Sequence, residues 1–162
     1  MKSLFLIRHA KSSWELNKED FERPLNKRGL SDAPMMAQRM RNRISTIDAV
    51  FSSPAVRAIT TAIFFAEEFG YSKKEIVTIP SLYLAKPEIY KTIIDGMDES
   101  LSSVAIFAHN PGITDFANSL TNVQVDDMPT CAIYAVQSST EVWKNFVQSP
   151  LKFLYFDYPK AL

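Results

Sequence analysis

Two short apolar runs that each end in a histidine constrain the fold of this chain most strongly. The run 4–7 is followed by Arg8 and His9, and the run 104–108 is followed by His109. Near-continuous apolar runs of this length are typical of strands buried on both faces, as in a sheet covered by helices. Ligands of open α/β sheets bind beyond the carboxyl ends of the strands. The pattern therefore predicts an anion site served by both histidines of the sequence.

The composition is that of one globular domain, which we expect to span residues 1–162. Hydrophobic residues make up 46% of the chain and charged residues 22%, with Lys+Arg and Asp+Glu both at 18. This even balance argues against nucleic acid and membrane as partners, because proteins that bind them through bulk charge carry an excess of positive charge. Any recognition of an anion must therefore be local.

The cysteine content and the N-terminal segment limit the chain further. A single cysteine, Cys131, excludes an internal disulfide, and one cysteine with two histidines cannot build a Cys/His zinc site. We therefore expect no metal site. The apolar stretch before Arg8 is too short for a signal peptide or for a membrane span of about 20 residues. These features predict a soluble, cytoplasmic protein.

The first third of the chain is expected to form a strand, a long loop and a helix. Residues 3–7 are the strand, and residues 8–25 are a loop that we expect to pack over the end of that strand. Asn26 is a plausible N-cap for a helix that runs to about Asn42. Pro34 interrupts this pattern, so either the helix kinks there or its regular part begins near Ser31. The helical spacing selects four residues for the buried face: Leu30, Ala33, Ala37 and Met40.

A second strand and helix follow at 47–51 and 53–69. Ser53 is the expected N-cap, Pro54 the first helical residue, and Gly70 the stop. Arg57 then lies in or just past the first turn. Its guanidinium would join the unpaired N–H groups and the positive end of the helix, a combination that favours a bound phosphate.

The rest of the chain repeats the alternation and then changes. We expect strands at 76–79 and 104–108, helices from Pro87 to about Gly96 and from 113 to 120, and two late strands at 131–136 and 152–156. The late strands are candidates for an antiparallel pair at the sheet edge. The fold class is therefore α/β, a three-layer α/β/α sandwich with a mainly parallel central sheet.

Three strand-to-helix junctions supply chemically active side chains: Arg8 and His9, then Arg57, then His109. Two arginines can bind a phosphoryl group through bidentate, charge-assisted hydrogen bonds. A neutral imidazole, with an ordinary pKa near 6.5, is a competent nucleophile at neutral pH if an acceptor holds its other nitrogen. The set thus predicts phosphoryl chemistry.

These motifs resemble those of the histidine phosphatase superfamily, the phosphoglycerate-mutase-like enzymes. The stretch 6–10 (LIRHA) resembles its Arg-His-Gly signature, 52–58 (SSPAVRA) with Thr61 resembles its second motif, and 107–112 (FAHNPG) is similar to its third. The small size, together with 23–29 (RPLNKRG) and 131–133 (CAI), is most similar to the phosphohistidine phosphatase branch, the SixA-like proteins.

The resemblance implies that His9 is the nucleophile and becomes transiently phosphorylated. Arg8, Arg57 and His109 would hold the phosphoryl oxygens, and water would hydrolyse the intermediate without a metal or organic cofactor. The implied partner is a phosphorylated protein carrying phosphohistidine, or a small phosphate ester.

Four further residues are candidates for substrate binding: Ser12, Ser13, Arg23 and Asn110. For the two serines the alternative is ordinary surface polarity. Arg23 either lines the pocket or forms a salt bridge with Asp20. Cys131 is expected to be a buried apolar residue rather than a nucleophile, because no phosphate-binding arginine follows it.

Two departures from the family pattern bear on the substrate. Ala10 replaces the usual glycine, a small change. The region of the acidic proton donor, 82–85, carries no carboxylate, so Glu88 or an acid from the 8–25 loop is the nearest candidate. A general acid accelerates alkyl phosphate hydrolysis by about 100- to 10,000-fold. Phosphohistidine depends on it less, because its ring nitrogen can be protonated before the bond breaks.

The sequence therefore predicts a protein phosphohistidine phosphatase and leaves two alternatives. One is a small-molecule phosphomonoesterase or mutase of the same superfamily, although a mutase would need inserted segments over the site. The other is a non-catalytic phosphate-binding module.

Overall fold

The structure, a computed structural model, describes residues 1–15 and 17–161, and its centre is a six-stranded sheet. The strands lie in the order β3-β2-β4-β1-β5-β6. Their bounds are β1 Lys2–Arg8, β2 Ala49–Ser52, β3 Val77–Thr78, β4 Ser103–Ala108, β5 Ile133–Ser138 and β6 Lys152–Asp157. The strands β3, β2, β4 and β1 run parallel to one another, whereas β5 is antiparallel to both β1 and β6. The predicted antiparallel pair at the sheet edge is thus confirmed.

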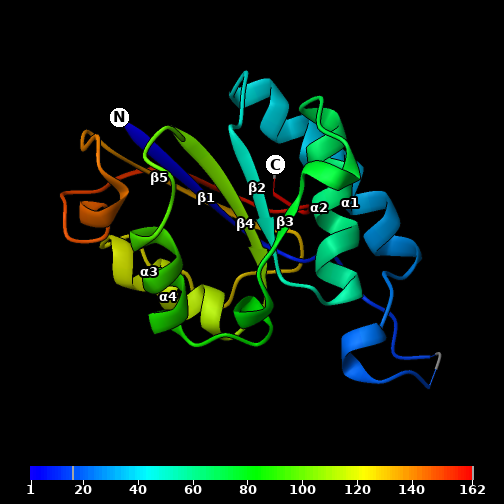
Figure 1. The fold of residues 1–162 in the computed structure, drawn as a ribbon. Coiled ribbons are helices and arrows are strands. Elements are labelled where there is room, and N and C mark those ends of the chain that lie inside the picture. Colours follow the sequence, from blue (N-terminus) through cyan, green and yellow to red (C-terminus); the bar gives the residue numbers. More distant parts are fainter. Residues whose placement is uncertain (16, 162) are drawn as a thin grey trace.

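Helices cover both faces of this sheet, as Figure 1 shows, so the three-layer α/β/α sandwich is confirmed. Helices α1 (Lys27–Arg43) and α2 (Val56–Glu68) lie on one face, and α3 (Pro87–Asp95) and α4 (Gly112–Leu120) on the other. A hydrophobic core lies on each face of the sheet, and alternate residues of β1 point into one or the other. Phe5 and Ile7 pack with α1 and α2, and Leu4 and Leu6 pack with α3 and α4. All four side chains are essentially inaccessible to solvent.

The strand order brings the predicted site residues together. Strand β4 lies between β1 and β2, and all three run parallel. Arg8 is in register with Ala108, and Ser52 with Phe107, so the three strands end at one edge of the sheet. The junctions that follow them meet there, as expected for an open α/β sheet.

Several predicted boundaries are corrected. The second strand starts at Ala49 instead of residue 47, and α2 starts at Val56 with Ala55 at the N-cap position instead of Ser53. Helix α1 begins where Asn26 caps it, through a hydrogen bond from the Gly29 N–H to Asn26 Oδ1 of 2.9 Å, and it continues through Pro34.

The buried face of α1 also differs from the expectation at one residue. Leu30 was placed in the core by helical spacing, but its side chain is exposed, whereas Ala33, Ala37 and Met40 are buried as predicted. The core of this helix takes Met36 instead. Near the N-terminus, the helix packs closely on the loop that precedes it, since a Cβ at Gly29 would lie 2.1 Å from the Lys11 carbonyl oxygen.

The loop between β1 and α1 folds back over the strand end, as predicted. It closes through an isolated antiparallel bridge between Ser12 and Leu25, and its far part forms a single 3-10 turn, Asp20–Glu22. Phe21 of that turn packs edge-on against the Tyr83 ring, with centroids 5.1 Å apart. The turn is thereby held over the end of the sheet.

The described residues include no helix long and apolar enough to cross a membrane.

Candidate active site

A cavity of about 240 Å³ lies at the common end of β1, β2 and β4. Arg8, His9, Arg57 and His109, the four residues predicted to act in catalysis, all line it. His9, Arg57 and His109 are nearly inaccessible to solvent, with exposed fractions of 6%, 2% and 1%. The floor of the cavity is therefore built from two imidazoles and two guanidinium groups.

Two hydrogen bonds fix the tautomer of His9. Its Nδ1 lies 2.8 Å from the Ala10 carbonyl oxygen, which can only accept, so Nδ1 carries the proton and donates it. The lone pair is then on Nε2, which accepts a long hydrogen bond from Arg57 Nε at 3.4 Å. Burial lowers the pKa of His9 to about 3, and the nearby His109, Arg57 and Arg8 reinforce this shift against the Ala10 hydrogen bond. His9 is therefore neutral at physiological pH.

Backbone contacts fix the strand end that carries His9. The Ala10 N–H donates to Thr61 Oγ1 at 2.9 Å, and the Thr61 hydroxyl donates to the Arg57 carbonyl oxygen at 2.7 Å. The Cys131 N–H donates to the His9 carbonyl oxygen at 3.0 Å. Thr61 thus ties the segment that carries His9 to the first turn of α2. Cys131 itself is buried, as expected.

His109 faces His9, with ring centroids 5.2 Å apart, and Ser53 orients it. Ser53 Oγ lies 2.7 Å from His109 Nε2 and accepts from the Ala55 N–H at 3.2 Å, so the hydroxyl hydrogen is available for Nε2. His109 Nδ1 then keeps its proton, and it has no partner among the described residues. Burial and the charge of Arg57 lower the pKa of His109 to about 3. A neutral imidazole with a free N–H donor results.

Arg8 is held from the far side of the cavity. Its Nη1 donates to the Met128 carbonyl oxygen at 2.8 Å, and its Nε is buried with no partner among the described residues, which leaves Nη2 for a ligand. Asn110, predicted to bind substrate, lines the cavity, but its amide hydrogens go to Asp127 Oδ1 and to the Met128 carbonyl oxygen, at 2.7 and 3.0 Å. Its amide oxygen accepts from Thr114. In this arrangement Asn110 holds the segment that positions Arg8.

Both roles predicted as alternatives for Arg23 are present: it lines the cavity, and it forms a salt bridge with Asp20 at 3.2 Å. Its Nη1 donates to Ser12 Oγ at 2.6 Å, and its guanidinium stacks 3.5 Å from the ring centre of Trp14. Ser12 is buried in the cavity wall. Ser13 lies outside the cavity and lines an adjoining depression, and its N–H donates to the Pro24 carbonyl oxygen at 2.8 Å.

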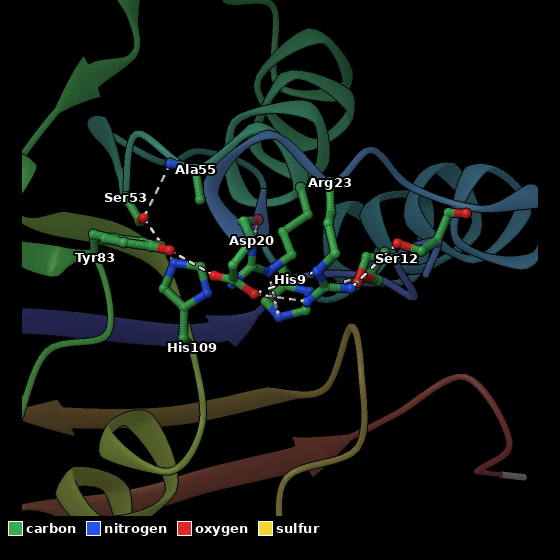
Figure 2. A network of polar contacts seen from close by, with 11 residues as sticks. His9, Ser12, Asp20, Arg23, Ser53, Ala55, Tyr83 and His109 are labelled. Atoms are coloured by element: carbon green, nitrogen blue, oxygen red, sulfur yellow. Dashed lines mark hydrogen bonds and ion pairs between the residues drawn. The ribbon is translucent and has the colours of Figure 1, made fainter. Parts of the chain in front are cut away.

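Asp20 enters the cavity from the loop between β1 and α1, so the acid near the site comes from the 8–25 loop, which was the alternative to Glu88, although the sequence did not identify which acid of that loop it would be. Figure 2 shows its carboxylate in the middle of the polar network, with Tyr83 and His109 on one side and Arg23 and Ser12 on the other. Its Oδ2 accepts from Arg57 Nη2 at 3.0 Å and from the Tyr83 hydroxyl at 2.5 Å.

The ionisation of Asp20 follows from these contacts. Burial pushes its pKa upward, but the hydrogen bonds from Tyr83 and Arg57 outweigh burial and lower it to about 2. Asp20 is therefore a carboxylate at neutral pH. The one available signal was its place three residues before Arg23 in a loop already expected over the strand end.

Glu88, the proposed proton donor, is not brought to the cavity. It is exposed in the first turn of α3 and lines a separate depression with Pro87, Lys91 and Phe116. The helix directs it away from the site, whereas Leu84, four residues earlier, reaches the cavity wall. No group of three or more His, Cys, Asp and Glu side chains that could hold a metal ion lies together in residues 1–15 and 17–161.

Sequence comparison identifies relatives of this chain. Residues 4–83 match the model of the histidine phosphatase superfamily, branch 1. An uncharacterised chloroplastic protein of Arabidopsis thaliana is 27% identical over 153 residues, which cover 89% of this chain and 70% of the relative. A protein of Mycobacterium tuberculosis is 26% identical over 121 residues, which cover 75% of this chain and 73% of the relative.

Solved structures share the fold over nearly the whole chain. A protein described as the phosphohistidine phosphatase SixA of Agrobacterium tumefaciens is similar with a TM-score of 0.81, 24% identity and 98% of both chains covered. A SixA protein histidine phosphatase complexed with tungstate has a TM-score of 0.81, 20% identity and 97% coverage of both chains. A mycobacterial glucosyl-3-phosphoglycerate phosphatase complexed with VO3 has a TM-score of 0.69 and 13% identity, with 98% of this chain and 100% of that chain covered.

The matched segment 4–83 contains Arg8, His9 and Arg57, and β4 brings His109 to the same cavity. Residues 4–83 are thus similar to the histidine phosphatase superfamily, and the chain has the phosphoglycerate-mutase-like fold of the SixA proteins.

Proposed function

We propose that this protein is a metal-independent phosphatase that forms a phosphohistidine intermediate on His9 and acts on protein phosphohistidine. The observation that carries the proposal is the state of His9: its Nδ1–H donates to the Ala10 carbonyl oxygen, and its unprotonated Nε2 lies beside the Arg57 guanidinium in a cavity that Arg8 also lines. A neutral, oriented imidazole beside two guanidinium groups is suited to attack a phosphoryl group.

In the first step His9 Nε2 attacks the phosphorus atom, and the bond to the leaving group breaks with its electron pair going to that group. Arg8 and Arg57 stabilise the negative charge on the phosphoryl oxygens, and the N–H at His109 Nδ1 donates a further hydrogen bond. His9 Nδ1 keeps its proton, which it donates in a hydrogen bond to the Ala10 carbonyl oxygen, so the ring phosphorylated at Nε2 is cationic. Water then attacks the phosphorus atom, and His9 leaves as the neutral imidazole.

Two features favour phosphohistidine as the substrate over alkyl phosphates. Glu88 lies outside the cavity, and the carboxylate that does enter it, Asp20, has a pKa of about 2 and holds no proton to donate at neutral pH. An alkoxide leaving group needs such a proton, whereas an imidazole does not. The names of the SixA structures, one of them complexed with the oxyanion tungstate, point the same way.

We infer that residues 1–162 form a single catalytic domain, that the protein acts in the cytoplasm, and that its partner is a phosphorylated protein, with no nucleic acid or membrane involved. A small phosphate ester is the alternative substrate, because a glucosyl-3-phosphoglycerate phosphatase shares the fold.

The proposal is tested by comparing kcat/KM for three substrates: a phosphohistidine-bearing protein domain, p-nitrophenyl phosphate and an alkyl phosphate. We expect the phosphohistidine protein to be the best substrate and the alkyl phosphate the poorest. Replacement of the nucleophile, His9→Ala, should reduce turnover of all three by a factor of about 1,000 or more.

Thermal unfolding of the His9→Ala protein serves as the control for folding. Equal rates for native and His9→Ala proteins would dismiss the nucleophile. A preference for alkyl phosphates over phosphohistidine would overturn the substrate and leave the mechanism standing.

A further inference from the structure

Asp20 is an anion at the entrance of a site built to bind an anion. Its side chain is 42% exposed, whereas the Arg57 side chain below it is 3% exposed. In-line displacement places the leaving group on the side of the phosphorus atom opposite to His9 Nε2. Because His9 forms the floor, the leaving group must lie toward the entrance, where Asp20 lies.

The contacts of Asp20 divide into those with Arg57, where a phosphoryl group would compete, and those with Arg23 and Tyr83, which would remain. Arg57 donates to Asp20 Oδ2 through Nη2 at 3.0 Å and to the Asp20 carbonyl oxygen through Nη1 at 2.6 Å, and a phosphoryl oxygen would compete for the same guanidinium. Arg23 donates to Oδ1 through Nε and Nη2 at 3.3 and 3.2 Å, and Tyr83 donates to Oδ2. After substrate binding, Arg23 and Tyr83 still hold the carboxylate while one lone pair of Oδ2 becomes free.

We propose that Asp20 is a specificity-determining residue that accepts a hydrogen bond from the protonated imidazole of a phosphohistidine substrate and so selects phosphoramidates over phosphate esters. The inference rests on the proposed function and deepens it. In the substrate the ring nitrogen not bound to phosphorus carries a proton, and the ring is cationic. The carboxylate stabilises this cation, which is the form of the substrate from which phosphorus is most readily transferred.

The transfer step then balances without any proton donor. The bond from phosphorus to His9 Nε2 forms while the P–N bond of the substrate breaks, and its electron pair stays on the substrate ring. The substrate leaves as a neutral imidazole that keeps its N–H, and the positive charge moves to the ring of phospho-His9. An ester follows a different course, since its leaving oxygen departs with negative charge, which the Asp20 carboxylate repels.

The test is the ratio of kcat/KM for a phosphohistidine-bearing protein domain to kcat/KM for p-nitrophenyl phosphate. In Asp20→Asn we expect kcat/KM for the phosphohistidine-bearing domain to fall by roughly tenfold or more, the ordinary effect of losing a hydrogen bond between two charged groups. We expect kcat/KM for p-nitrophenyl phosphate to rise, because the repulsion of the nitrophenolate is removed. Tyr83→Phe, which removes a donor to Oδ2, should also lower the ratio of the two values, but by less than Asp20→Asn.

The matched control is Glu22→Gln. Glu22 is exposed and lies in the same 3-10 turn, and its substitution removes one negative charge, as Asp20→Asn does. It should leave both rates unchanged. If kcat/KM for both substrates changes by the same factor in Asp20→Asn, in either direction, the inference is wrong. Asp20 would then only block the cavity or support the fold. Failure of the proposed function would be seen separately, as poor turnover of phosphohistidine by the native protein.

Discussion

The two imidazoles are the residues whose protonation decides what the cavity can do. His9 and His109 are buried beside two guanidinium groups, and the pKa of each falls to about 3. A cationic His9 could not attack phosphorus. The same guanidinium groups that we propose to bind a phosphoryl anion therefore also help to keep His9 unprotonated, and its ring has no carboxylate partner among the described residues.

This state predicts that neither histidine titrates in the ordinary range. The ring Cε1–H signals of His9 and His109, followed by NMR from about pH 8 to about pH 5, should stay at the positions of neutral imidazole. The chain has two histidines, so His9→Ala assigns both signals. A midpoint near the ordinary value for either ring would contradict the prediction.

The lowered pKa values of His9 and His109 also determine how the stability of the protein changes with pH. Both folded-state pKa values lie below the unfolded value of 6.5, so the unfolded chain takes up protons first as the pH falls. The free energy of unfolding should therefore be highest above about pH 6.5 and should fall progressively toward pH 3. Urea unfolding at the two ends of this range should show the lower stability in acid.

At the level of elements, the site depends on how α4 packs against the segment that follows the third strand. A Cβ at Gly112, in the first turn of α4, would lie 1.8 Å from the Ala85 carbonyl oxygen. This close approach sets the distance between His109, three residues before the glycine, and Tyr83, two residues before the alanine. Tyr83 in turn reaches Asp20.

Gly112→Ala should therefore destabilise the protein and disturb the site. We expect a loss of about 1–3 kcal/mol in the free energy of unfolding, as for other overpacked positions, and a lower kcat/KM. Gly96→Ala is the control, because its Cβ would meet nothing closer than the Thr92 carbonyl oxygen at 3.6 Å. This change should stay within about 0.5 kcal/mol of the native protein. Equal unfolding midpoints for the two variants would argue against the packing described.

Across the whole molecule, the sequence predicted what depends on regular strands and local motifs. The apolar runs before His9 and His109 predicted two buried strands, and their polar ends identified the edge of the sheet where the cavity lies. Leu30 was misplaced because its spacing fits a buried face, but the core of α1 takes Met36 instead. Helical periodicity does not specify which neighbouring row faces the sheet.

Contacts between distant segments were beyond the reach of the sequence. Asp20 meets Arg57 and Tyr83 only after the first loop has folded over the sheet, so no local pattern marks it. Glu88 was chosen for its nearness in sequence to the expected donor region, but the helix that begins at Pro87 directs it elsewhere. Position along the chain was in both cases a poor guide to position in the cavity.

The most direct test of the whole account is to trap the covalent intermediate. The native protein should be mixed with a phosphohistidine-bearing protein domain, quenched in alkali during a single turnover, and analysed by intact mass and peptide mapping. We expect one phosphoryl group on His9, stable in alkali and lost in acid, and none in His9→Ala. Turnover without a phosphorylated enzyme, or a phosphoryl group on any residue other than His9, would contradict the account.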